Sequence, residues 1–354
     1  MTPSSGQTSI SPRILCVSLG SIGRRHLRNA RSLVPNARIA VWRQHTPNNV
    51  LPEGADEVAL DLKAALDFKP DAVLVSSPAS EHIANARPFA QRNIPTFLEK
   101  PLASSSEGLN EFTALCSSSR GFTMVGYVLR FLPVLHAIRQ HILNGMLGHV
   151  YTARIEVGQY LPDWRPGSDY RKSVSSQRKL GGGALLELSH EIDYATWLFG
   201  WPRSIQCSAT RLSAMEIDVE DSAHVLMEYT DKRVCLQLDF LQRVASMAVQ
   251  IVGSNGTLMA DLIKEELRLI DPSNPTGRLL EVPKLPNGND IYLRQFDFFF
   301  SKAIPDYIPV YEQTNDFSEW ASVENAEKIL KLVDIAKHAS NSGIRQQMSF
   351  EKEP

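Results

Sequence analysis

Two side chains, Lys100 and His190, combine a reactive type with a position from which they could handle protons and negative charge. Lys100 stands between Glu99 and Pro101 at the end of an expected strand, where a lysine can hold a substrate oxygen and stabilise charge on it. Glu99 could help to set the protonation state of this lysine. A surface lysine beside a proline turn is the plain alternative.

His190 falls within a helix that the pattern predicts over 184–199, directly after three glycines at 181–183. At about 100° per residue, one face of this helix carries Glu187, His190, Glu191 and Tyr194. Histidine titrates near neutral pH, so with a carboxylate neighbour it is a candidate general acid or base for a hydroxyl proton. The same polar stripe is equally typical of the solvent-exposed face of an amphipathic helix.

A short apolar run from residue 14 leads into a turn of small residues, Ser18-x-Gly20-x-x-Gly23. Gly20 lets a pyrophosphate approach the backbone, Gly23 lets the following helix pack close to the strand, and the first helical turn, with Ser21 and Ile22, offers free N–H groups. Ser18 replaces the usual first glycine, and we expect it to keep a negative φ because its Cβ disfavours the left-handed region. The turn predicts a dinucleotide site, although an ordinary crossover in an α/β protein can have the same pattern.

Strand and helix segments alternate as far as residue 126. Strands are predicted at 38–42, 72–76, 95–99 and 122–125, and helices at 24–33, 61–68, 81–93 and 104–116. This alternation predicts an α/β fold with an N-terminal doubly wound Rossmann domain, whose ligands gather at the carboxyl ends of its parallel strands. Four candidate residues lie just after the carboxyl ends of predicted strands, namely Gly20, Arg43, Ser77 and Lys100.

Arg43 follows the second predicted strand, where folds that prefer NAD usually carry an acidic residue that binds the ribose 2′-OH. An arginine there favours the 2′-phosphate of NADP through a charge-assisted contact. NADP is therefore the expected cofactor, with NAD as the second possibility. A solvent-facing arginine in a loop is the alternative.

The pattern changes after residue 127. A helix at 131–145 and a strand at 151–158 precede a loop at 159–171 that is dense in aromatic and charged residues. Alternating runs then predict antiparallel strands at 205–209, 222–229, 234–241 and 246–252, a hairpin turn at 253–256, and late helices at 291–302 and 323–339. We expect a C-terminal α+β domain with a mainly antiparallel open sheet, whose uncovered face favours a homodimer or homotetramer.

The composition is that of a globular protein long enough for two domains, with 354 residues of which 43% are hydrophobic and 21% charged. We expect a flexible tail at 1–12, a dinucleotide-binding domain at 13–127 and a substrate-binding and oligomerisation domain at 128–347. The net charge of −2 argues against a nucleic-acid partner, and no apolar run is long enough to cross a membrane. Four scattered cysteines favour the reducing cytoplasm, and no spacing of histidines or cysteines indicates a metal site.

In this combination the chain resembles the Gfo/Idh/MocA family over about residues 13–344. The resemblance is carried by Gly20-Ser21-Ile22-Gly23-Arg24-Arg25-His26, Ser77-Pro78 with His82, Glu99-Lys100-Pro101, Gly126 with Arg130-Phe131, Gly181-Gly182-Gly183 with His190-x-x-Asp193, and Gly253-x-x-Gly256-Thr257. It implies an NAD(P)-dependent oxidoreductase that acts on a hydroxyl group of a sugar, cyclitol or nucleotide sugar.

The resemblance also implies roles for single residues. Lys100 would position the substrate and His190 would act as acid and base. Family members commonly have an aspartate four residues before this histidine, where this chain has Leu186. Either Glu187, three residues before the histidine, takes its place, or the local spacing is altered by one residue. Contacts to the cofactor are expected from the Gly20 turn and from Ser77, Pro78, His82, Glu99 and Lys100. For the sugar-like substrate we expect Tyr160, Asp163, Trp164, Tyr170 and Arg171, with Arg130 as a helper.

Two other functions are compatible with the same fold. A non-enzymatic sensor would bind the dinucleotide and regulate a partner, and an enzyme with a tightly retained nicotinamide would oxidise and then reduce substrates in turn. The enzymatic reading requires Lys100 from the first half and His190 from the second to meet at one cavity.

Overall fold

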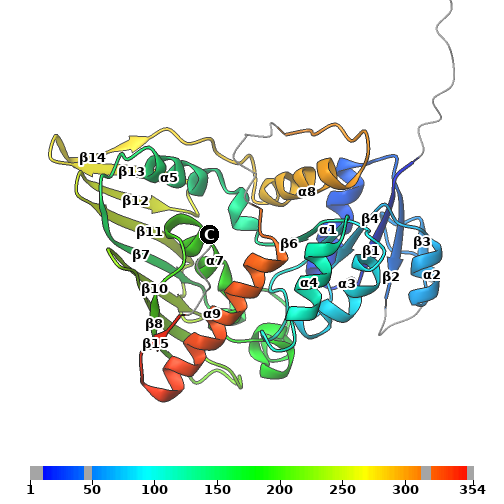
Figure 1. The fold of residues 1–354 in the computed structure, drawn as a ribbon, viewed down its shortest axis with the longest axis horizontal. Coiled ribbons are helices and arrows are strands. Elements are labelled where there is room, and N and C mark those ends of the chain that lie inside the picture. Colours follow the sequence, from blue (N-terminus) through cyan, green and yellow to red (C-terminus); the bar gives the residue numbers. More distant parts are fainter. Residues whose placement is uncertain (1–10, 44–49, 312–319, 349–354) are drawn as a thin grey trace, which may run out of the picture.

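The computed structural model describes residues 11–43, 50–311 and 320–348, so most of the tail expected at 1–12 lies outside the described residues. The chain forms two sheets at opposite ends of the molecule (Figure 1). The first is a parallel sheet in the order β3-β2-β1-β4-β5-β6. Its strands are β1 (Arg13–Val17), β2 (Arg38–Trp42), β3 (Glu57–Ala59), β4 (Ala72–Val75), β5 (Thr96–Leu98) and β6 (Thr123–Val125).

Helices alternate with these strands, and the predicted doubly wound fold is confirmed. They are α1 (Ser21–Leu33), α2 (Leu62–Asp67), α3 (His82–Ala90) and α4 (Asn110–Ser118). The chain winds from β1 to β3 in one direction and then places β4 on the other side of β1. The carboxyl ends of β1 and β4 therefore flank the point at which the winding reverses, where open α/β sheets bind ligands.

The start of α4 differs from the helix that the sequence predicts from residue 104. The helix begins six residues later, at Asn110. The segment before Asn110 is bonded to another part of the chain and does not join the helix. The backbone N–H and the hydroxyl of Ser106 both donate to Asp334, at 2.9 and 2.6 Å. Asp334 belongs to the last helix of the chain, a long-range partner that no local pattern indicates.

The turn between β1 and α1 also differs from the prediction. The expectation of a negative φ at Ser18 is wrong, because its φ is 69°. Its N–H donates to the carbonyl of Trp42 at 2.8 Å, which ties this residue to the end of β2. A Cβ at Gly23 would lie 2.6 Å from the carbonyl oxygen of Ser18, so this glycine allows the close approach of helix to turn. The left-handed conformation of Ser18 thus belongs to the fit between strand and helix.

A Ser18→Gly variant tests this strain. An L-residue in the left-handed region costs ~1–2 kcal/mol, so glycine should raise the free energy of unfolding by about 1 kcal/mol. The matched control is Ser173→Gly, at a serine with φ −73°, where glycine relieves no left-handed strain and adds entropy to the unfolded chain, so it should not give the gain expected at Ser18. Urea unfolding of the three proteins measures both effects. Equal losses in the two variants would contradict the strain at Ser18.

The second sheet has nine strands in the order β14-β13-β12-β11-β7-β10-β9-β8-β15, and all neighbours are antiparallel except β10 and β7. The strands are β7 (Val150–Gly158), β8 (Ser204–Thr210), β9 (Ser222–Glu228), β10 (Arg233–Asp239), β11 (Ser246–Gly253), β12 (Thr257–Asp261), β13 (Glu266–Asp271), β14 (Asn274–Leu280) and β15 (Gln346–Gln347). The mainly antiparallel C-terminal sheet is thus confirmed, with the expected hairpin between β11 and β12.

One face of this sheet is covered by helices of the same chain and the other is open. The covering helices include α6 (Ala184–Glu187), α7 (Ser189–Phe199) and α9 (Val323–Ser342), and α9 also packs on β6 of the first sheet. Figure 1 shows α9 running between the two sheets. On the open face, exposed side chains such as Arg154, His224 and Cys235 alternate with buried neighbours.

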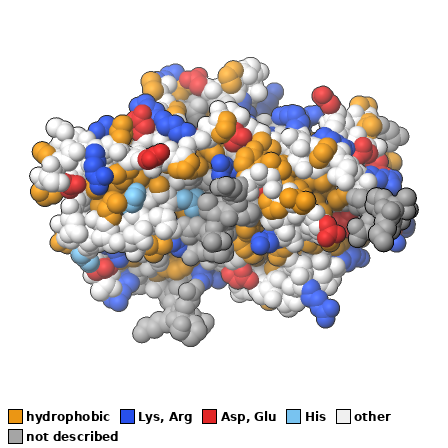
Figure 2. Space-filling view, turned by 90° about the horizontal axis from the view of Figure 1, so that it is seen from above, with side chains coloured by type: hydrophobic (Ala, Val, Ile, Leu, Met, Phe, Trp, Pro, Cys, Tyr) orange, Lys and Arg blue, Asp and Glu red, His pale blue; other side chains and the backbone are white. Residues whose placement is uncertain are grey.

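Two further helices complete the fold. α5 (Pro133–Leu143) packs against β13, and α8 (Asp290–Ala303) packs against α1. The face seen from above in Figure 2 carries apolar side chains near its middle, with Lys and Arg side chains around them. After α8, Ile308 and Val310 are 83% and 67% exposed.

Candidate active site

A cavity of about 590 Å³ lies between the two sheets and is lined from both halves of the chain. The first half contributes Ile22 from α1, Ser77 and Pro78 after β4, and Lys100 after β5. The second half contributes Glu187 and His190 from the helices that follow the glycine triplet, together with residues of the loop after β7. The structure therefore brings together the lysine and the histidine that the sequence analysis singled out.

Lys100 is held by Glu187 from the other half of the chain. Its Nζ donates to the backbone carbonyl of Glu187 at 2.7 Å and to Oε1 of the same residue at 3.0 Å. Oε2 of Glu187 accepts from the hydroxyl of Ser175 at 3.0 Å. Glu187 thus fixes the ammonium group in position.

Both partners of this contact are charged near neutral pH. Burial disfavours the ammonium of Lys100, but the charge and the hydrogen bond of Glu187 outweigh burial and raise the pKa of the lysine. Burial likewise disfavours the carboxylate, but Lys100 and Ser175 more than compensate and lower the pKa of Glu187. The cavity therefore holds a positively charged donor that is already oriented.

A break in the predicted helix over 184–199 makes this contact possible. Leu188 has φ −95° and ψ 28°, so α6 ends at Glu187 and α7 starts at Ser189, and the single-helix prediction is wrong. In a continuous helix, the carbonyl of Glu187 would accept from the N–H of Glu191. That N–H donates to Leu188 instead, at 3.3 Å, and the freed carbonyl accepts from Lys100.

His190 is placed to accept a proton. Burial, and then the charge of Lys100, lower the pKa of His190 well below its usual value, so the ring is neutral at pH 7. Its Nδ1 is buried without a hydrogen-bond partner, and the ring of Tyr127 meets it edge-on at a centroid distance of 5.6 Å. A neutral imidazole next to a charged ammonium suits proton transfer from a hydroxyl group.

The two other residues of the predicted polar stripe, Glu191 and Tyr194, lie in different surroundings. Glu191 also lines the cavity, and burial raises the pKa of its carboxyl to about 8. Tyr194 is fully buried and does not line the cavity. The stripe is therefore not a solvent-exposed helix face, and its members lie in different surroundings because the helix is broken at Leu188.

The turn at Gly20 fits the diphosphate of a dinucleotide. A Cβ added at Gly20 would have no atom within 4 Å, which leaves open space beside the backbone. The first turn of α1 has no side-chain cap and no acidic residue, so its N–H groups are free to meet an anion. Ile22 lines the main cavity, and Ser21 lines a neighbouring cavity of about 440 Å³. A cofactor bound at this turn could therefore reach the cavity of Lys100 and His190.

His82 and Glu99 hold the backbone around the site. Nδ1 of His82 lies 2.8 Å from the carbonyl of Pro101, and Nε2 lies 2.7 Å from that of Ser77. The ring thus links the loops after β4 and β5. Glu99 lies 2.6 Å from Nε2 of His26 and accepts from the backbone N–H of Lys100 at 3.0 Å. Both residues also line the cavity.

Of the residues predicted for the substrate, Trp164 lines both cavities and Tyr170 lines the smaller one. The others are placed elsewhere. Arg130 is buried in a two-pronged ion pair with Asp193, at 2.8 to 3.2 Å. Tyr160 lies beneath the guanidinium of Arg243, and Arg171 is paired with Asp169 and Glu216. Asp163 is exposed and lines neither cavity.

The sequence analysis missed several lining residues. Arg165 and Ser175 line both cavities, and Tyr292 reaches the larger one from α8. The charge of Arg165 also helps to lower the pKa of Glu187. Arg165 directly follows Trp164, so its place in the predicted loop was a usable signal, whereas nothing near Tyr292 in the sequence indicates its position.

The described residues contain no group of three or more His, Cys, Asp or Glu side chains arranged to hold a metal ion. None of the described helices is both long and apolar enough to cross a membrane.

Family models match both halves of the chain. Residues 13–127 match the oxidoreductase family with an NAD-binding Rossmann fold, and residues 135–259 match the GFO/IDH/MocA C-terminal domain. The chain belongs to the Gfo/Idh/MocA family. The predicted resemblance is therefore confirmed.

Members of the Gfo/Idh/MocA family are similar to the chain in sequence and in fold. This chain is 29% identical over 193 residues to the rhizopine catabolism protein MocA of Rhizobium meliloti, and the match covers 53% of this chain and 57% of that protein. It is 26% identical over 268 residues to an inositol 2-dehydrogenase of Acidothermus cellulolyticus, covering 71% and 73%. The chain thus spans little more than half of the first relative.

Solved structures of other dehydrogenases share the fold over nearly the full length. A levoglucosan dehydrogenase in complex with NADH has a TM-score of 0.78 at 17% identity, covering 96% of this chain and 99% of that one. The WlbA dehydrogenase of Bordetella pertussis, in complex with NADH and UDP-GlcNAcA, has a TM-score of 0.72 at 18% identity, covering 97% and 100%. At these identities the likeness shows the fold alone.

The coupling between Lys100 and His190 predicts a shift that NMR can measure. Removing the ammonium in Lys100→Met should raise the pKa of His190, because a nearby cation disfavours the imidazolium, while burial keeps it below the ordinary ~6.5. NMR titration of the imidazole carbon signal of His190 measures this pKa in both proteins. The matched control is Lys63→Met, at an exposed lysine bonded to Asp67, which should leave the signal unchanged. A pKa of His190 unaffected by loss of Lys100 would contradict the coupling.

Proposed function

We propose that the protein is an NAD(P)-dependent oxidoreductase that transfers a hydride between nicotinamide and a hydroxyl-bearing carbon of a sugar, cyclitol or nucleotide sugar. One observation carries this proposal: a charged lysine from the first half and a neutral histidine from the second line one cavity, next to an uncapped glycine turn. Membership of an oxidoreductase family supports it.

Lys100 and His190 have different roles in the reaction of the substrate hydroxyl group. Lys100, oriented by Glu187, donates a hydrogen bond to the substrate oxygen and stabilises negative charge on it. His190 is neutral and accepts the hydroxyl proton during oxidation, then returns it during reduction. Bound NAD(P) would supply the hydride acceptor or donor. Glu187 acts through Lys100 and is a positioning residue.

Single substitutions test these roles. Lys100→Ala and His190→Ala should each lower kcat by about 10²–10⁴-fold, the usual contribution of a positioned acid–base group, and leave NAD(P)H binding nearly unchanged. The matched control His149→Ala, at an exposed histidine in the turn before β7, should keep full activity. Steady-state kinetics and fluorescence titration with NADPH measure the two properties. Unchanged turnover in Lys100→Ala would refute its role.

The residues around the reacting position favour a sugar-like substrate. Trp164 offers a flat apolar face for a sugar ring, Ser175 offers a hydroxyl, and Arg165 adds a positive charge at the junction of the two cavities. The relatives named for inositol and levoglucosan and the complex with UDP-GlcNAcA support polyhydroxylated substrates. The charge of Arg165 acts on Glu187, but the ion-pair partner of Glu187 is Lys100 and Arg165 is in an ion pair with no described carboxylate, so we expect acidic sugars to be turned over best. A screen of cyclitols, neutral sugars and uronic acids tests this order.

The preference for NADP is proposed on the position of Arg43, which follows the carboxyl end of β2. Arg43→Gln should raise the KM for NADP by roughly tenfold, since a charge-assisted contact is lost, and should change the KM for NAD little. The control Arg38→Gln removes an arginine from the opposite end of the same strand. Equal effects on the two cofactors would refute this preference.

The same assays separate the rival functions. A sensor would bind NADPH without turning over any substrate in the screen, and an enzyme with a retained cofactor would release nicotinamide nucleotide when the purified protein is denatured. A homodimer or homotetramer is also proposed, supported by the open face of the second sheet. The four cysteines are unpaired, which supports a reducing compartment such as the cytoplasm.

A further inference from the structure

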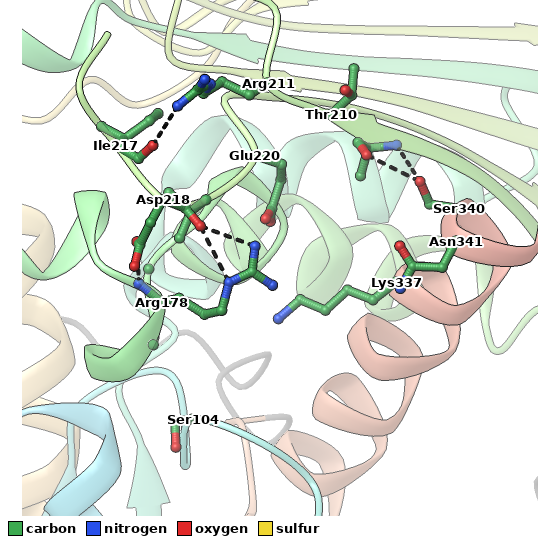
Figure 3. Close-up of a pocket in the computed structure, with 14 residues that line it drawn as sticks. Ser104, Arg178, Thr210, Arg211, Ile217, Asp218, Glu220, Lys337, Ser340 and Asn341 are labelled. Carbon is green, nitrogen blue, oxygen red and sulfur yellow. Dashed lines mark hydrogen bonds between the residues drawn. The ribbon is translucent and has the colours of Figure 1, made fainter.

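A second cavity, of about 460 Å³, lies on the other side of the glycine triplet from the candidate active site. Its walls come from the loop before α6, the connection between β8 and β9, and the last turns of α9 (Figure 3). Gly181 lines both cavities, so the two cavities adjoin at this residue. The proposed oxidoreductase reaction does not use any of the polar side chains that line this second cavity.

Three cationic side chains from three segments face this cavity: Arg178, Arg211 and Lys337. Nε and Nη2 of Arg178 donate to the carbonyl of Asp218 at 3.2 and 3.0 Å, and Nη1 of Arg211 donates to the carbonyl of Ile217 at 2.9 Å. Carbonyls fix the two guanidinium groups without cancelling their charge. Within the described part of the chain, none of the three cations forms an ion pair with a carboxylate.

Lys337 is the cation most available to a ligand. Its ammonium makes no hydrogen bond with any described residue, and Figure 3 shows it pointing from α9 across the cavity toward Arg178. Two like charges that face each other across open space favour an anion between them. A phosphate group matches both, since it accepts several hydrogen bonds from arginine and lysine.

The acidic residues of the cavity limit what else the ligand carries. Oδ1 of Asp218 accepts from the backbone N–H of Arg178 at 2.7 Å, and Oε1 of Glu220 accepts from that of Leu185 at 3.1 Å. The second carboxylate oxygen of Glu220 remains to accept from ligand hydroxyl groups, and Thr210 and Asn341 add polar atoms nearby. The volume also exceeds what a lone phosphate ion needs.

From this arrangement we propose that the cavity binds a phosphorylated sugar or polyol, with its phosphate between Arg178 and Lys337 and its hydroxyl groups at Glu220. An occupant would also touch the segment that positions the active site. The carbonyl of Glu220 accepts from the N–H of Ala184 at 3.0 Å, and its side chain holds Leu185, so Glu220 fixes both the start and the next residue of α6. Glu187, which orients Lys100, ends that same helix.

Calorimetric titration with glucose 6-phosphate tests the site, with the protein saturated with NADPH so that the turn at Gly20 is already occupied. We expect saturable binding that Lys337→Gln weakens roughly tenfold or more, as for the loss of a hydrogen bond to a charged group. Lys337 has no hydrogen bond with any residue that the structure describes, so this variant should keep the wild-type melting temperature. Arg178→Gln should also weaken binding. The matched control Lys331→Gln removes a lysine of α9 that is paired with Glu327 and should bind as wild type.

Each result decides one part of the proposal. No saturable binding, or equal binding by wild type and Lys337→Gln, refutes the site. Inorganic phosphate at equal ionic strength should bind more weakly than glucose 6-phosphate, and equal affinity would refute the recognition of hydroxyl groups by Glu220. Turnover should change with glucose 6-phosphate in wild type and not in Lys337→Gln, and binding without any change in turnover would refute the link to α6. The binding assay needs no turnover, so its outcome is independent of the proposed reaction.

Discussion

The active site depends on one contact between the two halves of the chain, the pairing of Lys100 with Glu187. The loop after β5 provides the ammonium, and the end of α6 provides both a carboxylate and a free carbonyl. Each charge would be unfavourable in this half-buried place without the other. The same pairing keeps a positive charge near His190, which helps to hold the imidazole neutral. Substrate orientation and proton transfer therefore both depend on the contact between the end of α6 and the loop that follows β5.

Much of the fold could be predicted from local patterns. The parallel strands are continuous apolar runs because helices cover both faces, and the later strands alternate because one face of their sheet is open. Elements without such a pattern were missed. β14 contains Pro275 and Gly277 and forms by pairing with β13. β3 has only three residues, too few for any periodicity.

The candidate site was predictable where chemistry and strand position coincide, as for Lys100, His190 and the Gly20 turn. It was not predictable where a distant partner decides the outcome. Arg130 has the charge of a ligand-binding residue, but Asp193 holds it inside the protein. Ser18 adopts φ 69° although its type argues against it, because the close approach of α1 and the bond to Trp42 determine its backbone. Periodicity assigns a helix over 184–199 and contains no information on the lysine that competes for one of its carbonyls.

The last helix of the chain also completes the first sheet. β6 lies at an edge of that sheet, and the segment just before α9 lies along it, with the N–H of Val125 donating to the carbonyl of Ala321 at 2.9 Å and Met124 bridged to Ser322. A fragment that stopped after residue 127 would leave these backbone groups unpaired along a bare strand, which is a common route to aggregation. The nucleotide-binding half therefore needs a segment about 200 residues further along the chain to cover its edge, and during synthesis on the ribosome this edge stays uncovered until residues 321 and 322 have been made.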